Sequence, residues 1–177
     1  MAGKIAPRAV APIVIADTSP IIGLSLIGGL DWIKPLFGAV HITRQVQDEL
    51  LFNVKTDPRP GMAEIEQVIG KRVLKVIRKD WALPLFAHLD DGEASVLRAA
   101  ANQKGACLVF INETLGRHAA IERGIAVTGL VGLIIAAKKA RLIPKIAPVL
   151  ERLEQAQFRL SAQLIADALA LAGEGAR

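Results

Sequence analysis

Short apolar runs that alternate with longer helical stretches constrain the fold of this chain more than any other feature. Residues 13–16 and 107–111 are continuous apolar runs without polar alternation. Strands of this kind are typical of a parallel sheet that helices cover on both faces. The alternation along the chain therefore predicts an α/β fold in which helices connect parallel strands.

Five strands and the helices between them can be placed by periodicity and by local end signals. Pro20 suits the first turn of a helix, and Thr43 offers an N-cap for another. We expect strands at residues 13–16, 39–42, 73–77, 107–111 and 125–127. We expect helices near residues 20–27, 30–37, 44–51, 62–69, 89–103, 116–123, 130–140, 148–157 and 161–172.

Length and composition limit the classes of protein to which the chain can belong. Its 177 residues, 52% of them hydrophobic, suit one domain with a real core, which we place at residues 12–174 after a flexible tail at 1–11. The single cysteine excludes an internal disulfide framework and a multi-cysteine zinc site. The net charge of +5 permits a polyanionic partner. Residues 1–12 make a poor signal peptide and no later apolar stretch is long enough to span a bilayer, so we expect a cytoplasmic protein without membrane attachment.

Polar side chains follow the first and fourth predicted strands. Asp17 comes directly after residues 13–16, and Asn112 and Glu113 come after residues 107–111. Ligands of open parallel sheets bind at the carboxyl ends of the strands. A carboxylate at position 17 has two interpretations: it caps the following helix, or it handles a metal ion or a phosphate.

Three acids within four residues form the second candidate cluster: Asp90, Asp91 and Glu93. The spacing from Asp90 to Glu93 is that of a capping box, and negative charges suit the first turn of a helix, so a structural role competes with a functional one. Such a cluster requires relief by solvent, a cation or a raised pKa. On the helix after the second strand, chemistry alone does not separate Glu49 from Asp48.

The order and spacing of several motifs resemble the PIN-domain family. The chain shows IADTSPIIGLSL from residue 15, LDDGEASVLRAA at 89–100, LVFINETLGRHAAIERG from residue 108 and FRLSAQLIADALALAGE at 158–174. The resemblance covers residues 12–174. It implies a three-layer sandwich with a central five-stranded parallel sheet flanked by helices. It also implies a Mg²⁺- or Mn²⁺-dependent endoribonuclease, and many bacterial members are toxins of type II toxin–antitoxin pairs.

The resemblance also implies roles for particular residues. The family's acids match Asp17, Glu49, Glu93 and Glu113 as catalytic residues. The hydroxyl beside the first acid matches Thr18 or Ser19, which support the site. The implied metal ligands are Asp17, Glu93, Asn112 and Glu113. Relatives often carry two acids after the fourth strand, and here Asn112 takes the place of the first, which removes one negative charge from the site.

Asn112 keeps a second interpretation open. The leading hypothesis is a toxin that cleaves RNA and is held by a small antitoxin protein. The alternative is a catalytically degenerate PIN module that binds RNA or a protein partner without cleavage. A third reading, a metal-dependent phosphatase of small molecules, requires a closed pocket. The resemblance implies homodimers as well, and basic residues such as Lys71, Arg72 and Lys138 are candidates for holding RNA phosphates.

Overall fold

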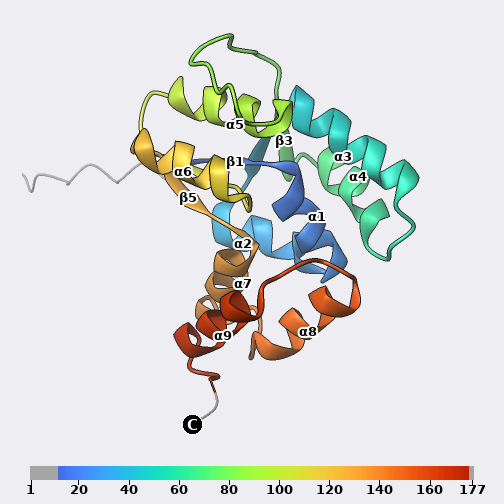
Figure 1. The fold of residues 1–177 in the computed structure, drawn as a ribbon. Helices are drawn as coiled ribbons and strands as arrows, with labels where there is room; N and C mark the ends of the chain where they lie inside the picture. The colour runs from blue at the N-terminus through green and yellow to red at the C-terminus, as the bar shows by residue number, and fades with distance from the viewer. Residues whose placement is uncertain (1–11, 176–177) are drawn as a thin grey trace, which may run out of the picture.

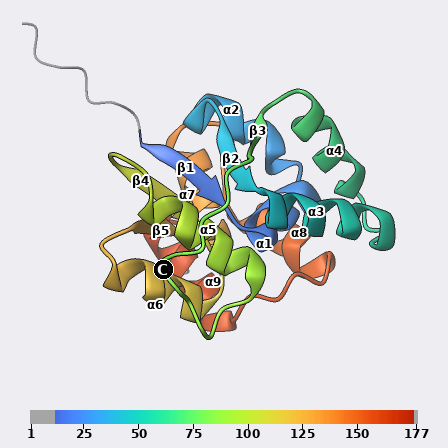
Figure 2. The same ribbon diagram turned by 90° about the horizontal axis from the view of Figure 1, so that it is seen from above.

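The computed structural model describes residues 12–175, and a five-stranded sheet lies at its centre (Figures 1 and 2). The strands are β1 (Ile13–Ala16), β2 (Val40–Thr43), β3 (Leu74–Ile77), β4 (Cys107–Phe110) and β5 (Ala126–Thr128). They lie in the order β3-β2-β1-β4-β5, and every neighbouring pair is parallel. The predicted α/β fold with five parallel strands is confirmed.

Helices cover both faces of this sheet and complete the predicted three layers. On one face α5 (Asp91–Ala101) packs across β1, β2 and β4, with α3 (Arg44–Thr56) and α6 (Thr114–Glu122) beside it. Figure 1 shows α2 (Ile33–Phe37) and α7 (Leu130–Lys139) on the opposite side. The other helices are α1 (Thr18–Leu26), η1 (Gly29–Trp32), α4 (Met62–Gly70), α8 (Ala147–Gln155) and α9 (Ala162–Leu171).

Local signals explain where several helices begin and end. The Thr43 hydroxyl accepts a hydrogen bond from the Val46 amide at 3.3 Å, which confirms the predicted N-cap of α3. Gly28 has a φ of 68°, the left-handed conformation that commonly follows a helix, and it separates α1 from η1. The helix predicted at residues 30–37 is instead a 3-10 turn followed by the short α2.

The core is mainly aliphatic, as the composition predicts. Phe110 is its largest fully buried side chain, and its ring packs edge-on against Phe37 with centroids 5.1 Å apart. On α9 the apolar stripe faces mostly inward: Ala168 is buried and Ile165 packs against the core, but Leu164 remains 42% exposed. Packing of α9 against α7 therefore accounts for most of the stripe.

Two further predictions concern the start of the chain and its surroundings. The tail predicted at residues 1–11 lies outside the described residues. Within residues 12–175 no single helix is long and apolar enough to cross a membrane. The bent pair Thr18–Leu26 and Gly29–Phe37 meets that test on length and composition alone.

The carboxyl ends of β1 and β4 lie side by side and position the candidate site. Ala16 pairs with Phe110, and the Asp17 amide donates a hydrogen bond to the Phe110 carbonyl at 3.0 Å. The strand order also changes direction here, because the chain runs from β1 to β2 and β3 on one side and returns to β4 and β5 on the other. Such a switch point opens a crevice where α/β sheets bind ligands.

Candidate active site

A pocket of about 390 Å³, here called the acidic pocket, lies at this edge of the sheet. Its walls come from the start of α1, from α3, from the residues before α5 and α6, and from the linker between α8 and α9. The lining residues are Asp17, Thr18, Ser19, Ile22, Glu49, Arg59, Asp90, Glu113, Gln157, Phe158 and Arg159. The topology therefore brings three of the four predicted catalytic acids into one cavity.

Asp17 is buried and occupies the N-cap position of α1. Its side chain makes no capping hydrogen bond within the described part of the chain, so capping does not account for it. Burial raises the pKa of Asp17 to about 7, and the negative charges of Asp90 and Glu49 contribute to this rise. The backbone N–H of Thr18 favours the charged form and opposes the rise. Asp17 is thus a carboxyl group that the fold holds against its preference for the charged form.

Glu93 is not one of the residues that line the acidic pocket, and it is only 5% exposed. Burial raises the pKa of this carboxyl to about 7, and the charges of Asp90, Asp17, Glu113 and Glu49 contribute to the increase. Asp90, not Glu93, caps the helix: its Oδ1 accepts a hydrogen bond from the Glu93 backbone amide at 2.7 Å. The Oε1 atom of Glu93 is buried and has no hydrogen-bond partner among the described residues.

Glu49 enters the acidic pocket from α3, whereas the adjacent Asp48 lines a separate pocket with Arg44 and Arg78. The structure thus separates two acids that sequence chemistry could not. The Thr18 hydroxyl donates a hydrogen bond to Glu49 Oε2 at 2.5 Å. One of the two predicted hydroxyls therefore joins the end of β1 to α3.

Two glycines let these carboxylates lie close to helix backbones. A Cβ on Gly92 would come within 2.7 Å of Glu49 Oε1, and one on Gly116 within 2.8 Å of Glu93 Oε1. Real Cβ atoms essentially never make such close contacts. Any larger residue at either position would therefore push a carboxylate out of its place.

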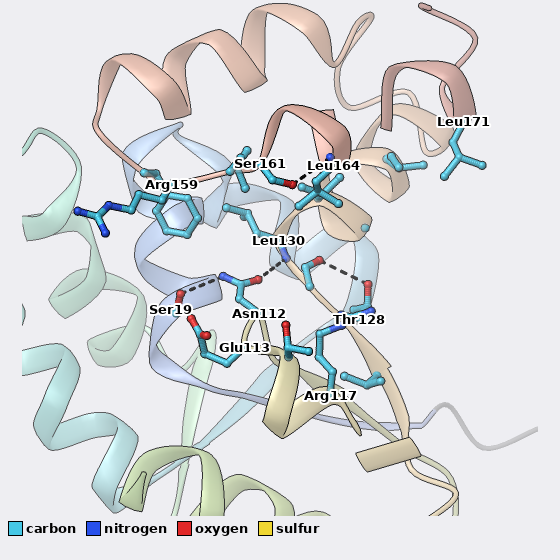
Figure 3. Close-up of a pocket in the computed structure, with 18 residues that line it drawn as sticks. Ser19, Asn112, Glu113, Arg117, Thr128, Leu130, Arg159, Ser161, Leu164 and Leu171 are labelled. Carbon is cyan, nitrogen blue, oxygen red and sulfur yellow. Dashed lines mark hydrogen bonds between the residues drawn. The ribbon is translucent and has the colours of Figure 1, made fainter. Parts of the chain in front are cut away.

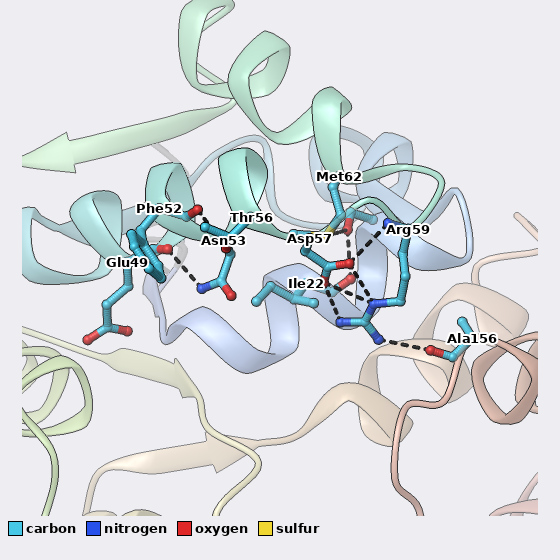
Figure 4. Close-up of polar contacts among 10 residues, drawn as sticks. Ile22, Glu49, Phe52, Asn53, Thr56, Asp57, Arg59, Met62 and Ala156 are labelled. Atoms are coloured by element: carbon cyan, nitrogen blue, oxygen red, sulfur yellow. Dashed lines mark hydrogen bonds and ion pairs between the residues drawn. The ribbon is translucent and has the colours of Figure 1, made fainter.

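No cation neutralises the acids of this pocket at close range. In residues 12–175 the ion pairs are Arg59–Asp57 and Lys138–Glu174, and neither includes an acid of the acidic pocket or Glu93. Arg59 lines the pocket but is bound elsewhere (Figure 4): it pairs with Asp57 at 2.6 Å and donates to the Ala156 carbonyl at 2.9 Å. Arg59 thus ties the loop before α4 to the end of α8 across the pocket.

The donor chemistry of the pocket fits a hard divalent cation. Its acids supply carboxylate oxygens, which Mg²⁺ and Mn²⁺ prefer, and the unpartnered Oε1 of Glu93 is a buried acceptor without a donor. Across the described residues, however, no three His, Cys, Asp or Glu side chains are close enough together to form a metal site as they stand. Three of these acids could hold one cation only if their side chains moved closer together.

Asn112 lies away from this cluster and lines a neighbouring pocket of about 680 Å³, here called the side pocket (Figure 3). The Leu130 amide donates to its Oδ1 at 2.8 Å, and its Nδ2 donates to the Ser19 hydroxyl at 2.9 Å. Since a backbone N–H can only donate, the first contact fixes which end of the amide faces Ser19. The structure therefore places Asn112 between Ser19 and the start of α7, outside the acidic pocket.

The cations near the two pockets are also not those that the sequence suggested. Lys71 and Arg72 line a different cavity with the first residues of β1, at the opposite end of the strands. Arg59 and Arg159 line the acidic pocket instead, and Arg117 lines the side pocket. Arg117 and Arg159 lie within motifs of the family resemblance, but nothing in those motifs places them at a pocket, because only the folded chain brings their segments together.

Other pocket residues were also missed from the sequence. Asp90 belongs to the predicted acidic cluster but not to the acids that the family resemblance matches, and it lines the acidic pocket as well as capping α5. Gln157 and Phe158 lie in the linker after α8. The motif that begins at Phe158 shows nothing about where in the fold this linker lies. The arrival of these two residues at the pocket depends on how the C-terminal helices pack.

Comparison with known proteins identifies one matching family. A family model described as a PIN domain matches residues 13–174, nearly the whole chain. No curated protein matches the chain.

Proposed function

The chain belongs to the PIN-domain family, and from this premise we propose that it is a divalent-metal-dependent endoribonuclease that hydrolyses RNA phosphodiester bonds. PIN domains are generally nucleases and typically use divalent metal ions. The observation that carries the proposal is the pair Asp17 and Glu93, two buried acids with raised pKa values and no cationic partner within the described chain. Buried acids that the fold leaves uncompensated are typical of functional sites.

We assign the direct metal ligands to Asp17 and Glu93, with Glu49 and Glu113 completing the set. A bound Mg²⁺ or Mn²⁺ would supply the positive charge that lets an acid-lined pocket accept a phosphate and would lower the pKa of a water molecule. Thr18 holds Glu49 in place through its hydroxyl. Asn112 acts on the site through Ser19, since its amide already bonds Ser19 and Leu130.

The biological setting that we propose is a toxin–antitoxin pair in which a small partner protein blocks the acidic pocket. The excess of carboxylates there suits a partner segment that carries a cationic side chain. Co-expression of the chain with the product of an adjacent small reading frame tests this role. We expect the pair to co-purify and the purified pair to cleave RNA less than the chain alone.

The experiment that tests the activity is cleavage of structured and unstructured RNAs with Mn²⁺ or Mg²⁺. We expect wild type to cleave and Asp17→Asn to lose at least about 100-fold, because even outer-shell losses at metal sites cost roughly 10–100-fold. The matched control is Asp48→Asn, since Asp48 is exposed and lies outside the acidic pocket. It should cleave like wild type, and a chelator should stop both.

A second candidate function, binding without cleavage, is favoured by Asn112 alone. Folded wild-type protein that cleaves no RNA with either metal contradicts the nuclease proposal. Asn112→Asp then separates the two functions, because its carboxylate can accept from both Leu130 and Ser19 and restores the missing charge. Continued inactivity of Asn112→Asp, together with RNA binding by wild type, would establish the binding module. The phosphatase reading loses support because the acidic pocket adjoins the larger side pocket through shared walls.

A further inference from the structure

The side pocket opens beside the acidic pocket and shares walls with it. Ser19, Glu113, Phe158 and Arg159 line both cavities. The side pocket has about 680 Å³ of space, which is within the range of pockets that hold small organic groups. A molecule with one part in the acidic pocket can therefore place its neighbouring part in the side pocket without leaving the protein surface.

Apolar, polar and charged side chains line the side pocket. Its apolar residues include Val131, Ile135 and Leu164, and Glu113 supplies a carboxylate at the wall shared with the acidic pocket. Phe158 supplies an aromatic ring, and Arg117 and Arg159 supply positive charge. The Arg117 guanidinium donates to the Ile111 carbonyl at 3.3 Å, which holds its side chain against the end of β4.

The position of Phe158 follows from the end of α8. Gln157 has a φ of 58°, a left-handed conformation, and the Phe158 amide donates back to the Leu153 carbonyl at 2.9 Å. This turn sends Phe158 and Arg159 across the boundary between the two pockets. An aromatic ring is therefore held beside a cation and next to the proposed site of phosphate cleavage.

We propose that the side pocket binds the base of a nucleotide adjacent to the phosphate in the acidic pocket, with Phe158 as its stacking surface. This inference rests on the proposed function and specifies its substrate as single-stranded RNA. A paired base cannot leave its helix at low cost, whereas an unpaired base is free to stack on an aromatic side chain. Arg159 contacts the phosphate that joins the two nucleotides. We favour a nucleotide over a protein segment because two cations, Arg117 and Arg159, line the side pocket together with Phe158.

The test measures binding of a short single-stranded RNA with phosphorothioate linkages, which resist hydrolysis, in the presence of Mn²⁺. A matched strand of abasic nucleotides has the same charges and no bases. We expect Phe158→Ala to weaken binding of the base-bearing strand about 10-fold and to leave binding of the abasic strand unchanged. Fluorescence anisotropy of labelled strands gives both affinities.

The matched control is Phe52→Ala, because Phe52 is 67% exposed on α3 and lines neither pocket. It should change neither affinity. Phe158 is partly buried against the core, so Phe158→Leu is tested as well. Leucine keeps the apolar packing without the flat ring, and we expect it to weaken the base-bearing strand alone, at an unchanged melting temperature.

The two proposals can fail separately. Wild type that cleaves RNA, while Phe158→Ala and Phe158→Leu weaken both strands equally or neither, overturns the base pocket and leaves the nuclease intact. Wild type that prefers the base-bearing strand and cleaves nothing overturns the nuclease and leaves the base pocket. A third outcome would assign the side pocket to protein contact. In that outcome the chain binds both strands equally and self-associates, and Leu164→Asp abolishes the self-association.

Discussion

Glu174 near the C-terminus and Glu93 near the acidic pocket are both largely buried glutamates, yet their surroundings shift their pKa values in opposite directions. Glu174 lies 2.6 Å from Lys138 Nζ and accepts hydrogen bonds from the amides of Ile146 and Ala147. Burial raises its pKa, but these partners outweigh burial and lower the pKa to about 2. Glu93 has no cationic partner among the described residues, and burial and neighbouring acids raise its pKa to about 7.

The difference shows that burial alone does not decide the state of an acid. The chain can satisfy a shielded carboxylate completely, and it does so where α7, α8 and the C-terminal segment meet. At the carboxyl edge of the sheet it gathers acids that form no ion pair among residues 12–175, which costs folding free energy. The same chain supplies a cation and two backbone amides to Glu174. Acids that are left without such an ion pair in the described part of the chain therefore indicate a functional requirement at this edge.

The largest expected effect comes from displacing the unpartnered acid. Gly116→Ala would place a Cβ 2.8 Å from Glu93 Oε1 and 2.9 Å from Ile111 Cγ2, and since Ile111 is fixed in the core, the flexible carboxylate is the group that moves. We expect RNA cleavage to fall about 100-fold, since small misplacements of catalytic groups have costs of this size. The matched control is Gly70→Ala, where an added Cβ meets nothing within 4 Å. Equal cleavage by both variants would show that the position of Glu93 is unimportant.

The partnered acid should matter for stability instead. Glu174→Gln leaves Lys138 without its counterion, and we expect the free energy of unfolding at pH 7 to fall by about 2 kcal/mol. Because the pKa of Glu174 is lowered to about 2, this contribution is present above the ordinary pKa of 4.5 and is lost as the pH falls toward 2. Urea denaturation between pH 2 and 7 measures it. Glu151→Gln, at an exposed position of α8, should show no such loss.

Replacing Glu93 by glutamine should have the opposite effect on stability from replacing Glu174. Glu93→Gln removes a buried charge that other acids repel, and we expect metal-free protein at pH 8 to gain about 1 kcal/mol of unfolding free energy. At pH 5 only a small part of this gain should remain, and below about pH 4 it should vanish, because the carboxyl group is then protonated in both the folded and the unfolded chain. Destabilisation at pH 8 would mean that Glu93 serves the fold, and the contrast with Glu174 would disappear.

The smallest effect is the response of the pocket to metal at different pH values. Asp17 and Glu93 bind protons more tightly when folded, since each pKa rises to about 7, so their stabilising contribution is present below about pH 4 and lost as the pH passes 7. A divalent cation competes with those protons. We expect Mn²⁺ to raise the melting temperature by about 3 °C at pH 8 and not at pH 5. The variant with both Asp17→Asn and Glu93→Gln should not respond at either pH.

Much of this fold is predictable from residue patterns because each element carries its own signal. Continuous apolar runs located β1 and β4, and Thr43 marked the start of α3. The position of Asp17 at the carboxyl edge followed from the parallel sheet alone. What patterns could not predict was any contact between distant segments, such as Arg59 with Ala156, because that depends on how whole helices pack.

The candidate site shows the same limit. That acids gather at this edge of the sheet was predictable, and their catalytic roles stay predictions. Their raised pKa values were not predictable, because these require burial and the placement of every neighbouring charge. Asn112 was expected to share the metal site as a neutral ligand, and the structure instead places its amide between Ser19 and Leu130. A sequence shows that a charge has been lost, but not which hydrogen bonds the replacement makes.

The orientation of the Asn112 amide determines where the hydroxyl hydrogen of Ser19 can point. Because Nδ2 donates to the Ser19 hydroxyl, Ser19 is the acceptor in that contact, and its own hydrogen is free to point elsewhere. An aspartate at position 112 would reverse this arrangement, since a carboxylate can only accept and Ser19 would have to donate to it. With asparagine, the serine that borders both cavities keeps a hydroxyl hydrogen that it can donate into either of them.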